Sequence, residues 1–338
     1  MLNTFRVDRP INAIRNVVMS LLALALVVLA ACDSSTETAV DTDTDKAKPV
    51  RVALVMKSLA NEFFINMAEG AKSHQQQSSG NKANNYELIV NGIRNESDLA
   101  QQVSLVEQMM AAQVDVIVLA PVDSKGLLPV VKRAIDQGII VINIDNRFDQ
   151  DILTQMGVSV PFVGPDNHEG AKQVGQLLAK KLQAGDEVAI IGGIPSAFNA
   201  QQRQAGFEDA MSEAGATIVS IQSADWGQSK AAAIAAAILS ENPNLKALLC
   251  ANDSMALGAV AAVRQAGRTG EVLVVGFDNI SAANVLVQSG EMLATADQHG
   301  DKLAVFGIEY ALQILAGGTT PENRKTPVDL IVAQQIKK

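Results

Sequence analysis

Side chains that suit ligand binding follow two apolar runs in residues 248–279. Asn252 comes after the first run and Asp278 after the second, and apolar residues recur at helical spacing between them. This pattern predicts a β-α-β unit. Because ligands of open parallel sheets bind beyond the carboxyl ends of the strands, we expect Asn252 and Asp278 to share one pocket. The alternative is that Asn252, Asp253 or Asp278 only caps the following helix, and Asp253 is the best candidate for that role.

Polar and aromatic side chains also follow three other predicted strands. They are Lys57, Asn61, Phe63 and Phe64 in the first group, Asp145, Asn146 and Arg147 in the second, and Trp226 in the third. Aromatic rings stack on the apolar faces of sugars, carboxylates accept hydrogen bonds from hydroxyl groups, and guanidinium groups donate them. These strand ends therefore predict a site for a polyhydroxylated ligand. The alternatives are core packing for the two phenylalanines and a surface ion pair between Asp145 and Arg147.

Patterns that would indicate catalysis or nucleic-acid binding are weak. His74, His168 and His299 have no spacing suited to a metal site or a catalytic triad, so we expect no metal and no cofactor. Glycines follow one predicted strand, but neither a dinucleotide nor a P-loop motif is present. Asp145 and Asp278 could form the carboxylate pair of a glycosidase, yet the amide and aromatic groups at the same strand ends favour binding without turnover. The net charge of −9, with scattered Lys and Arg, argues against nucleic acid.

The 338-residue chain has the composition of an α/β protein, with 48% hydrophobic, 19% charged and 4% aromatic residues. Strand-like and helix-like patterns alternate along it, which predicts parallel sheets. They form two similar series, over residues 49–165 and 166–298, and the chain then returns through a helix at 303–315 and a last strand at 328–332. We expect a further strand over Thr154–Val163, where the first series ends. Two such sheets facing each other would bring their strand ends to one cleft.

The first residues have the pattern of an export signal. Basic residues precede the uncharged run 17–31, which is short for a membrane-spanning helix, and small residues lead to Cys32. This arrangement resembles the lipobox of bacterial lipoproteins, which implies a signal peptide at residues 1–31 and lipid attachment to Cys32. Residues 32–48 are polar and predict a flexible tether, and Asp33 resembles an inner-membrane retention signal of enteric-type bacteria. The alternative is an ordinary secretory signal.

Six motifs occur in a specific order along the chain: Lys57-Ser58-Leu59-Ala60-Asn61-Glu62-Phe63-Phe64, Asp145-Asn146-Arg147, Ala224-Asp225-Trp226, Cys250–Gly258, Val274–Asp278 and Ala294–Gln298. Together they resemble the periplasmic sugar-binding proteins of ABC importers, of the ribose, allose and galactose type, from about Val50 to the C-terminus. The resemblance implies an α/β fold with two Rossmann-like lobes, the periplasmic binding protein type 1 fold. Their parallel sheets are joined by a three-strand hinge near Pro165, Gln298–His299 and Asp329–Leu330.

The resemblance also implies lobe boundaries and ligand contacts. The N-terminal lobe would hold residues 49–165 plus 299–329, and the C-terminal lobe residues 166–298 plus 330–338. The positions that bind sugar in this family fall on Asn61, Phe63, Phe64, Asp145, Trp226, Asn252, Asp278 and Gln298. Further predicted contacts are Lys57, Asn146, Arg147, Asn199 and Arg203. Among these, Lys57 is similar to a lysine of allose-type members.

Three positions depart from the pattern of ribose binders. Those proteins carry Arg directly after the Asp, whereas Asn146 intervenes here before Arg147. Glu62 replaces a usual Pro, and Gln201 stands where ribose binders have an Arg. An aldohexose, another pentose or a polyol is therefore as good a candidate ligand as ribose.

The function implied by the resemblance is that of a lipid-anchored solute-binding protein on the periplasmic side of a bacterial membrane, and not of an enzyme. It would close at its hinge around a monosaccharide or polyol and deliver it to an ABC permease. We expect a monomer that needs no cofactor and binds no nucleic acid. Two alternatives share the fold. A sugar sensor would present its closed form to a membrane signalling protein, and a repressor of the lactose type would need a helix-turn-helix where this chain has an export signal.

Overall fold

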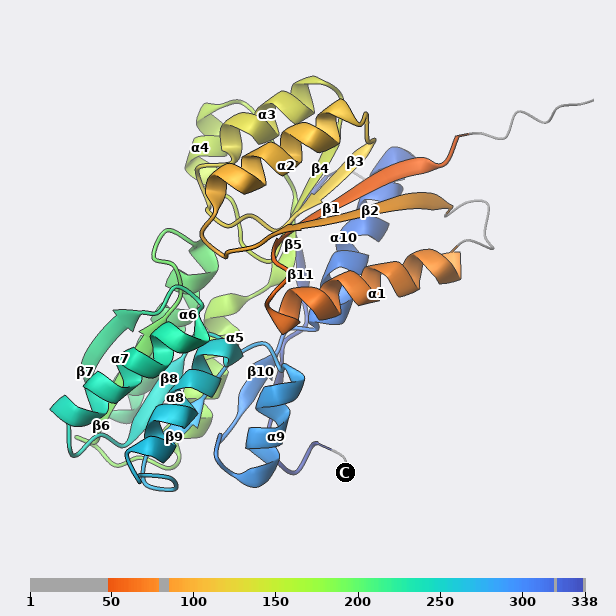
Figure 1. The fold of residues 1–338 in the computed structure, drawn as a ribbon. Coiled ribbons are helices and arrows are strands. Elements are labelled where there is room, and N and C mark those ends of the chain that lie inside the picture. Colours follow the sequence, from red (N-terminus) through yellow and green to blue (C-terminus); the bar gives the residue numbers. More distant parts are fainter. Residues whose placement is uncertain (1–47, 79–84, 319–320, 337–338) are drawn as a thin grey trace, which may run out of the picture. The chain divides into compact units, whose positions relative to one another are not determined.

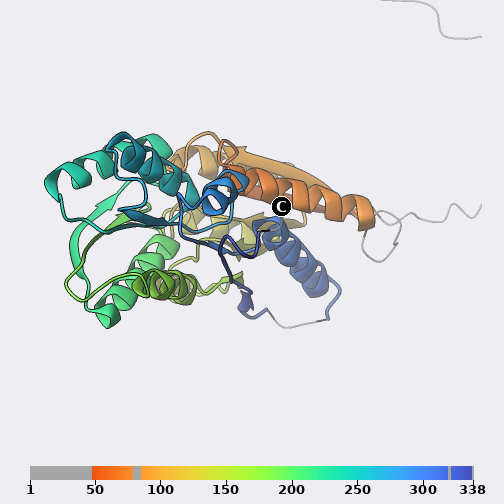
Figure 2. The ribbon, with the colours of Figure 1, turned by 90° about the horizontal axis from the view of Figure 1, so that it is seen from below.

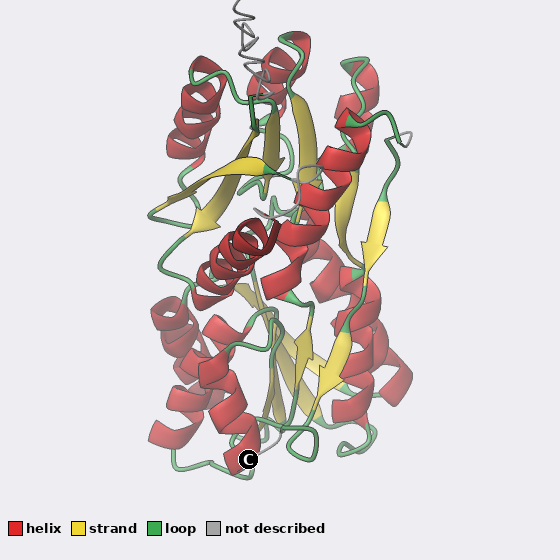
Figure 3. Cartoon of the chain, turned by 90° about the vertical axis from the view of Figure 1, so that its right-hand side faces the viewer, coloured by secondary structure: helices red, strands yellow, loops and turns green. Residues whose placement is uncertain are grey.

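A computed structural model describes residues 48–78, 85–318 and 321–336 of the chain. The predicted signal peptide, the lipid-attachment residue Cys32 and nearly all of the predicted tether therefore lie outside the described residues. The described part has two lobes, each built around a parallel sheet with helices on its faces (Figures 1 and 3). The α/β fold with two Rossmann-like lobes is thereby confirmed.

The first lobe contains a six-stranded sheet in the order β11-β5-β4-β3-β1-β2. Its strands are β1 (Val50–Ser58), β2 (Tyr86–Ile93), β3 (Val116–Leu119), β4 (Ile140–Ile144), β5 (Phe162–Pro165) and β11 (Arg324–Thr326), and all its pairings are parallel. The middle of β1, Val52–Met56, is buried on both faces. A central parallel strand covered on both faces needs such a continuous apolar run instead of an alternating one.

Helices cover both faces of the first sheet. They are α1 (Glu62–Ser78) and α10 (Gly300–Leu315) on one face, with α2 (Leu99–Ala111) and α3 (Leu128–Asp136) on the other. Alternate residues of β1 separate the two layers, since Leu54 packs in the core that holds α1 and α10, while Val55 packs in the core that holds α2 and α3. The carboxyl ends of β1 and β4 are thus held in a rigid sheet.

The second lobe contains a four-stranded parallel sheet in the order β7-β6-β8-β9. Its strands are β6 (Glu187–Gly192), β7 (Thr217–Ser223), β8 (Ala247–Cys250) and β9 (Leu273–Val275). The helices of this lobe are α5 (Asn167–Ala179), α6 (Phe198–Ala214), α7 (Gln228–Glu241), α8 (Asp253–Gln265) and α9 (Ser281–Ser289). The pairs α5/α6 and α7/α8 pack closely, and Figure 2 shows helices on both sides of this sheet.

Three chain segments connect the two lobes. One lies at Pro165–Asp166 between β5 and α5, and one at Gln298–His299 between β10 (Thr295–Asp297) and α10. The third lies at Pro327–Val328 between β11 and β12 (Asp329–Ile331), and β12 pairs antiparallel with β10. Two of these segments lie where the resemblance placed the three-strand hinge, and the third lies just before the expected Asp329–Leu330, which belongs to β12.

Two of the sequence-based expectations for elements were wrong. The strand expected over Thr154–Val163 begins only at Phe162, and the short helix α4 (Gln150–Gln155) precedes it. Asp149 starts that helix because its side chain accepts a hydrogen bond from the Ile152 amide at 3.0 Å. Strand β11 was not expected at all, since its Arg-Lys-Thr sequence has no apolar pattern; it forms by pairing with β5. In the described part of the chain, no helix is both long and apolar enough to span a membrane.

Candidate functional site

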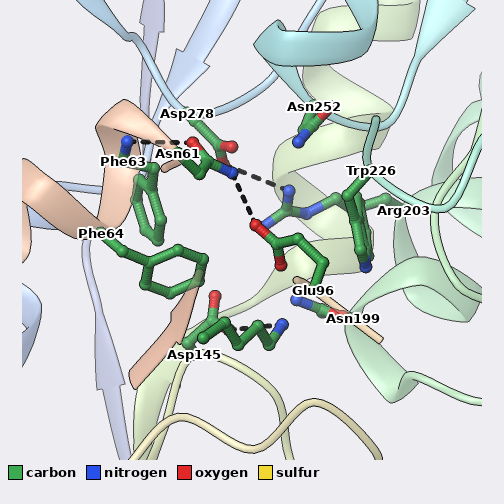
Figure 4. Close-up of a pocket in the computed structure, with 11 residues that line it drawn as sticks. Asn61, Phe63, Phe64, Glu96, Asp145, Asn199, Arg203, Trp226, Asn252 and Asp278 are labelled. Atoms are coloured by element: carbon green, nitrogen blue, oxygen red, sulfur yellow. Dashed lines mark hydrogen bonds and ion pairs between the residues drawn. The ribbon is translucent and has the colours of Figure 1, made fainter. Parts of the chain in front are cut away.

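A cavity with about 240 Å³ of space unoccupied by atoms lies where the strand ends of the two lobes meet. The side chains that line it are Lys57, Asn61, Phe63, Phe64, Glu96, Asp145, Asn199, Arg203, Trp226, Asn252 and Asp278 (Figure 4). Ten of the thirteen residues predicted to contact ligand line it, and they come from both lobes.

The first lobe contributes an ion pair from the ends of two strands that lie on either side of β3 in the sheet. Lys57, at the end of β1, places its Nζ atom 2.8 Å from Oδ2 of Asp145, which follows β4, and both side chains are about 3% exposed. Asp145 has a positive φ of 61°, a backbone conformation that is unusual for a residue other than glycine. Such strain often persists at binding sites because the surrounding fold holds it in place. The pair offers a hydroxyl group both donor and acceptor atoms.

The second lobe contributes a buried cluster around Arg203. This guanidinium comes from α6 and lies 3.2 Å from Oδ1 of Asp278, which also accepts a hydrogen bond of 2.6 Å from the Gln298 amide. Arg203 stacks on Phe277 with 3.8 Å between its Cζ atom and the ring centre. It further donates to the Asn167 side chain at 2.8 Å. With these partners Arg203 is fixed in one orientation, which is how a preorganised ligand contact is built.

Asn252 both caps a helix and faces the cavity. Its Oδ1 atom accepts a hydrogen bond of 2.9 Å from the Met255 amide at the start of α8, and its amide nitrogen points toward the cavity (Figure 4). The expectation that Asp253 would be the cap of this helix was wrong. Asp253 instead accepts hydrogen bonds from the Thr295 hydroxyl at 2.8 Å and the Ile280 amide at 3.0 Å. It therefore ties the strand ends of the second lobe together behind the site.

Aromatic rings close the cavity on two sides. Phe63 and Phe64 meet edge to face with 5.1 Å between their ring centres. Trp226 lies opposite them, and its ring centre is 5.7 Å from both the Lys57 ammonium and the Arg203 guanidinium. The position after β6 must be a glycine for a steric reason. A Cβ atom at Gly193 would lie 2.2 Å from the Trp226 ring. Gly193 therefore makes room for the indole.

Three predicted residues do not line the cavity. Gln298 lies behind Asp278, to which it donates. Asn146 reaches across to the second lobe. Its side-chain Oδ1 atom accepts a hydrogen bond of 3.2 Å from the backbone N–H of Asn199. Arg147 packs between two rings, with about 6 Å from its Cζ atom to the centres of Phe162 (6.0 Å) and Phe198 (5.9 Å). The Asp145 carboxylate is paired with Lys57, so the surface ion pair with Arg147, the alternative raised from the sequence, is not seen among the described residues.

Glu96 lines the cavity and was missed by the sequence analysis. It lies three residues beyond the end of β2, and its Oε1 atom accepts a hydrogen bond of 2.9 Å from the Asn61 amide. The rule that ligand-binding side chains follow strand ends could have found it, because β2 ends in the same sheet edge as β1. Its loop has an amide at Asn95 but lacks the aromatic group that marked two of the other strand ends.

Burial has a clear effect on two carboxyl groups of the site. Loss of solvent raises the pKa of Asp278 to about 7, although the Arg203 guanidinium opposes this shift. Loss of solvent also raises the pKa of Glu96, with Lys57 opposing and Asp145 reinforcing the change. Among the described residues, no cluster of His, Cys, Asp and Glu could hold a metal ion. The site is thus an enclosed set of hydrogen-bond donors and acceptors flanked by aromatic rings.

The family described as a periplasmic binding protein domain matches residues 52–319. The chain belongs to this family. A D-ribose/D-allose-binding protein of Pseudomonas aeruginosa is 55% identical to it over 316 residues, which cover 92% of this chain and 97% of that protein. The family places the protein in the periplasm, and its relatives are binding proteins of ABC importers, not enzymes.

Two crystal structures of family members are similar in fold and sequence. One is an ABC transporter solute-binding protein from Burkholderia multivorans, which is 55% identical with a TM-score of 0.82 over 85% of this chain and 100% of that one. Its unknown ligand was described as α-D-erythrofuranose. The other is a periplasmic solute-binding protein from Actinobacillus succinogenes with bound D-allose, 36% identical with a TM-score of 0.80 over 85% of this chain and 99% of that one. The chain is therefore a ribose/allose-type solute-binding protein.

Proposed function

We propose that this protein captures one monosaccharide or polyol between its lobes and delivers it to an ABC importer in the membrane. The observation that carries this proposal is the cavity between the strand ends, where eleven side chains from both lobes bring hydrogen-bonding groups and aromatic rings together. D-Allose and D-ribose are the favoured ligands, since family members with those names or ligands are the most similar relatives described above. The predicted residues that line the cavity would contact the sugar, while Asn146, Arg147 and Gln298 would support them.

Hinge closure would follow from how the contacts are divided. Lys57 and Asp145 belong to the first lobe, whereas Arg203, Asn252 and Asp278 belong to the second. A sugar that contacts the side chains of both lobes stabilises the closed conformation. In the open conformation it could contact the side chains of only one lobe. We assign residues 49–165 plus 299–329 to the N-terminal lobe and residues 166–298 plus 330–338 to the C-terminal lobe. A permease would then recognise the closed form.

Calorimetry and thermal shift with a panel of sugars test this proposal. Residues 33–338 would be titrated with D-allose, D-ribose, D-galactose, D-arabinose and myo-inositol. A ligand at about 100 times its dissociation constant stabilises the fold by roughly 2.7 kcal/mol, which a thermal shift detects. The proposal predicts saturable binding of at least one of these compounds with one site per chain. Failure of every sugar and polyol to bind or to stabilise the protein would contradict it.

We further propose that Cys32 carries a lipid anchor and that residues 32–48 tether the folded lobes to the membrane. The small residues before Cys32 and the polar composition of the segment support this assignment. Expression in a Gram-negative host, followed by fractionation, would test it. The wild-type protein should partition with membranes and carry an acyl modification detectable by mass spectrometry. The Cys32→Ala protein should be found in the soluble fraction and carry no acyl modification. Equal amounts of wild-type and Cys32→Ala protein in the soluble fraction would refute the anchor.

A further inference from the structure

One polar side chain interrupts the apolar run of strand β4. That run is Ile140–Ile144, and Asn143 stands in it with only 1% of its surface exposed. A buried amide lowers the stability of a fold unless its hydrogen bonds are made inside the protein. Asn143 is not among the residues that line the cavity, so contact with a ligand does not account for it. The hydrogen bonds of Asn143 within the fold must therefore carry its role.

The Asn143 side chain binds the loop that follows its own strand. Its Oδ1 atom accepts a hydrogen bond of 2.9 Å from the backbone N–H of Phe148, and its Nδ2 atom donates one of 2.8 Å to the backbone oxygen of Asn146. The Nδ2 atom also lies 3.3 Å from the backbone oxygen of Ile144 and 3.4 Å from that of Leu119 in β3. Both ends of the amide are thus engaged, and they fasten the loop at two points beyond the strand.

The loop that Asn143 fastens begins with a strained turn at Asp145. The backbone N–H of Asn146 donates a hydrogen bond of 2.7 Å to the backbone oxygen of Ile144, so three residues form a turn with Asp145 at its centre. Asp145 has a φ of 61°, and a three-residue turn with a positive φ at its centre is the rare and strained form. A residue other than glycine relaxes from this conformation unless its surroundings prevent it. The two hydrogen bonds of Asn143 to the loop are in place to do so.

The direction of this turn sets the direction of the Asp145 side chain. The carboxylate lines the cavity and lies 2.8 Å from the Lys57 ammonium. If the turn relaxed to an ordinary backbone conformation, the Cα–Cβ bond would swing and the carboxylate would leave this place. We propose that Asn143 is a positioning residue, which holds the strained turn and thereby directs the Asp145 carboxylate at the sugar. This inference rests on the proposed function of the cavity as a sugar site.

The neighbouring contact between the lobes has anchors of its own. The Asn146 side chain donates a hydrogen bond of 3.0 Å to the backbone oxygen of Pro121, and its Oδ1 atom accepts one of 3.3 Å from the Ser124 hydroxyl. These bonds hold the side chain of Asn146 without help from Asn143. The effect of Asn143 on affinity should therefore be transmitted through Asp145.

A double-mutant cycle, measured by calorimetry with D-allose and D-ribose, tests this route. Asp145→Ala should weaken binding by about a hundredfold, because a charged acceptor is lost and Lys57 is left unpaired. Asn143→Ala should weaken it by about tenfold, since the carboxylate remains but is no longer fixed in place. The double variant should bind within about threefold of Asp145→Ala alone, because a positioning residue has no effect once the group that it positions is gone.

Unfolding in urea tests the turn without any ligand. Glycine tolerates a positive φ at position 145 better than alanine does, so Asp145→Gly should unfold at a higher urea concentration than Asp145→Ala. In the Asn143→Ala background these two substitutions should lose this order, because the turn is then free to relax and glycine only adds flexibility to the unfolded chain. If Asn143 merely stabilised the fold, its loss would lower both midpoints equally and leave the order unchanged.

Ile142→Ala is the matched control. It removes a buried side chain from the same strand and should lower the urea midpoint without changing affinity. Asn143→Thr, which suits a strand, replaces Asn143→Ala if that variant does not fold. Additive losses of affinity in the cycle, or an unchanged order of the two position-145 variants, would overturn the inference. If the wild type binds neither sugar, the proposed function fails for them, and the unfolding comparison still tests the turn.

Discussion

At the scale of single residues, Asp278 combines a place in the cavity wall with a structural role that the sequence did not indicate. It faces the cavity, and it also neutralises the buried guanidinium of Arg203 at 3.2 Å. A residue that only bound ligand could be removed without harm to the fold. Asp278 cannot, because its loss leaves Arg203 buried without its carboxylate.

We therefore predict that Asp278→Ala loses both ligand binding and stability. Removal of one partner of a buried ion pair costs about 3–5 kcal/mol, so the free energy of unfolding in urea should fall by about 3 kcal/mol. Calorimetry should show at least about a hundredfold weaker binding of D-allose or D-ribose, since several hydrogen bonds are lost together. Asp278→Asn, which keeps the shape and one acceptor, is the comparison and should be less destabilised. Normal affinity in both variants would remove Asp278 from the site.

Trp226 provides a direct report of ligand binding. It is the one tryptophan of the chain, it lines the cavity, and its Nε1 atom is buried without a hydrogen-bond partner among the described residues. Closure around a sugar removes water from the indole, so its emission should shift to shorter wavelength in a saturable manner. Trp226→Phe should abolish the signal. An emission spectrum that ligand leaves unchanged, while calorimetry shows binding, would contradict this placement of Trp226.

At the scale of elements, the first lobe depends on a close approach of two helices that lie far apart in the sequence. Helix α1 packs against α10, the helix formed after the chain returns from the second lobe. Gly70 makes this possible, because a Cβ atom there would lie 1.8 Å from the carbonyl oxygen of Asp301. Since α1 also carries Phe63 and Phe64, this contact positions one wall of the cavity.

We predict that Gly70→Ala destabilises the protein while leaving its ligand contacts in place. The added methyl group forces the two helices apart, and overpacking of this kind costs about 1–3 kcal/mol. Chemical denaturation should show a free energy of unfolding lower by about 2 kcal/mol, with a smaller change in affinity. Glu69→Ala, its exposed neighbour on α1, should change stability little. Equal stability of Gly70→Ala and the wild type would show that the helices do not pack as described.

At the scale of the whole binding unit, the two lobes are also joined by direct hydrogen bonds outside the pairs described in the cavity. The Ser124 hydroxyl oxygen accepts a hydrogen bond of 2.9 Å from the Phe198 amide, and Asn146 accepts one from the Asn199 amide. On the other side of the cleft, a Glu62 carboxylate oxygen accepts one of 2.7 Å from the Ser281 amide. All three join residues of the first lobe to helix starts of the second. These direct hydrogen bonds between the lobes add to the contacts that favour closure.

Ser124→Ala should accordingly weaken ligand binding without destabilising the fold. The lost hydrogen bond is worth about 1 kcal/mol, which corresponds to roughly fivefold weaker binding. The unfolding free energy of the ligand-free protein should stay within about 0.5 kcal/mol, because water solvates the Phe198 amide when the lobes separate. Ser104→Ala, on the exposed side of α2, is the control. Unchanged affinity of Ser124→Ala in calorimetry would mean that this contact plays no part in closure.

The sequence by itself determined the α/β class, the two series of strands and helices, and most of the side chains of the cavity. It could do so because parallel sheets place their ligands at strand ends, and residues such as Asn61, Asp145 and Asn252 follow strands whose apolar runs are unmistakable. It failed at Thr154–Val163 and at β11, where a strand forms through its neighbours and not through its own pattern.

Only the tertiary structure decided how the charged groups are paired. An ion pair between Asp145 and Arg147 was one alternative from the sequence, but strand order in the sheet brings Lys57 to that carboxylate from almost ninety residues away. Packing likewise brings Arg203, on helix α6, to Asp278 in the loop after β9. Tertiary packing sets the distances between groups that are remote in the chain, so these distances cannot be predicted from local sequence patterns.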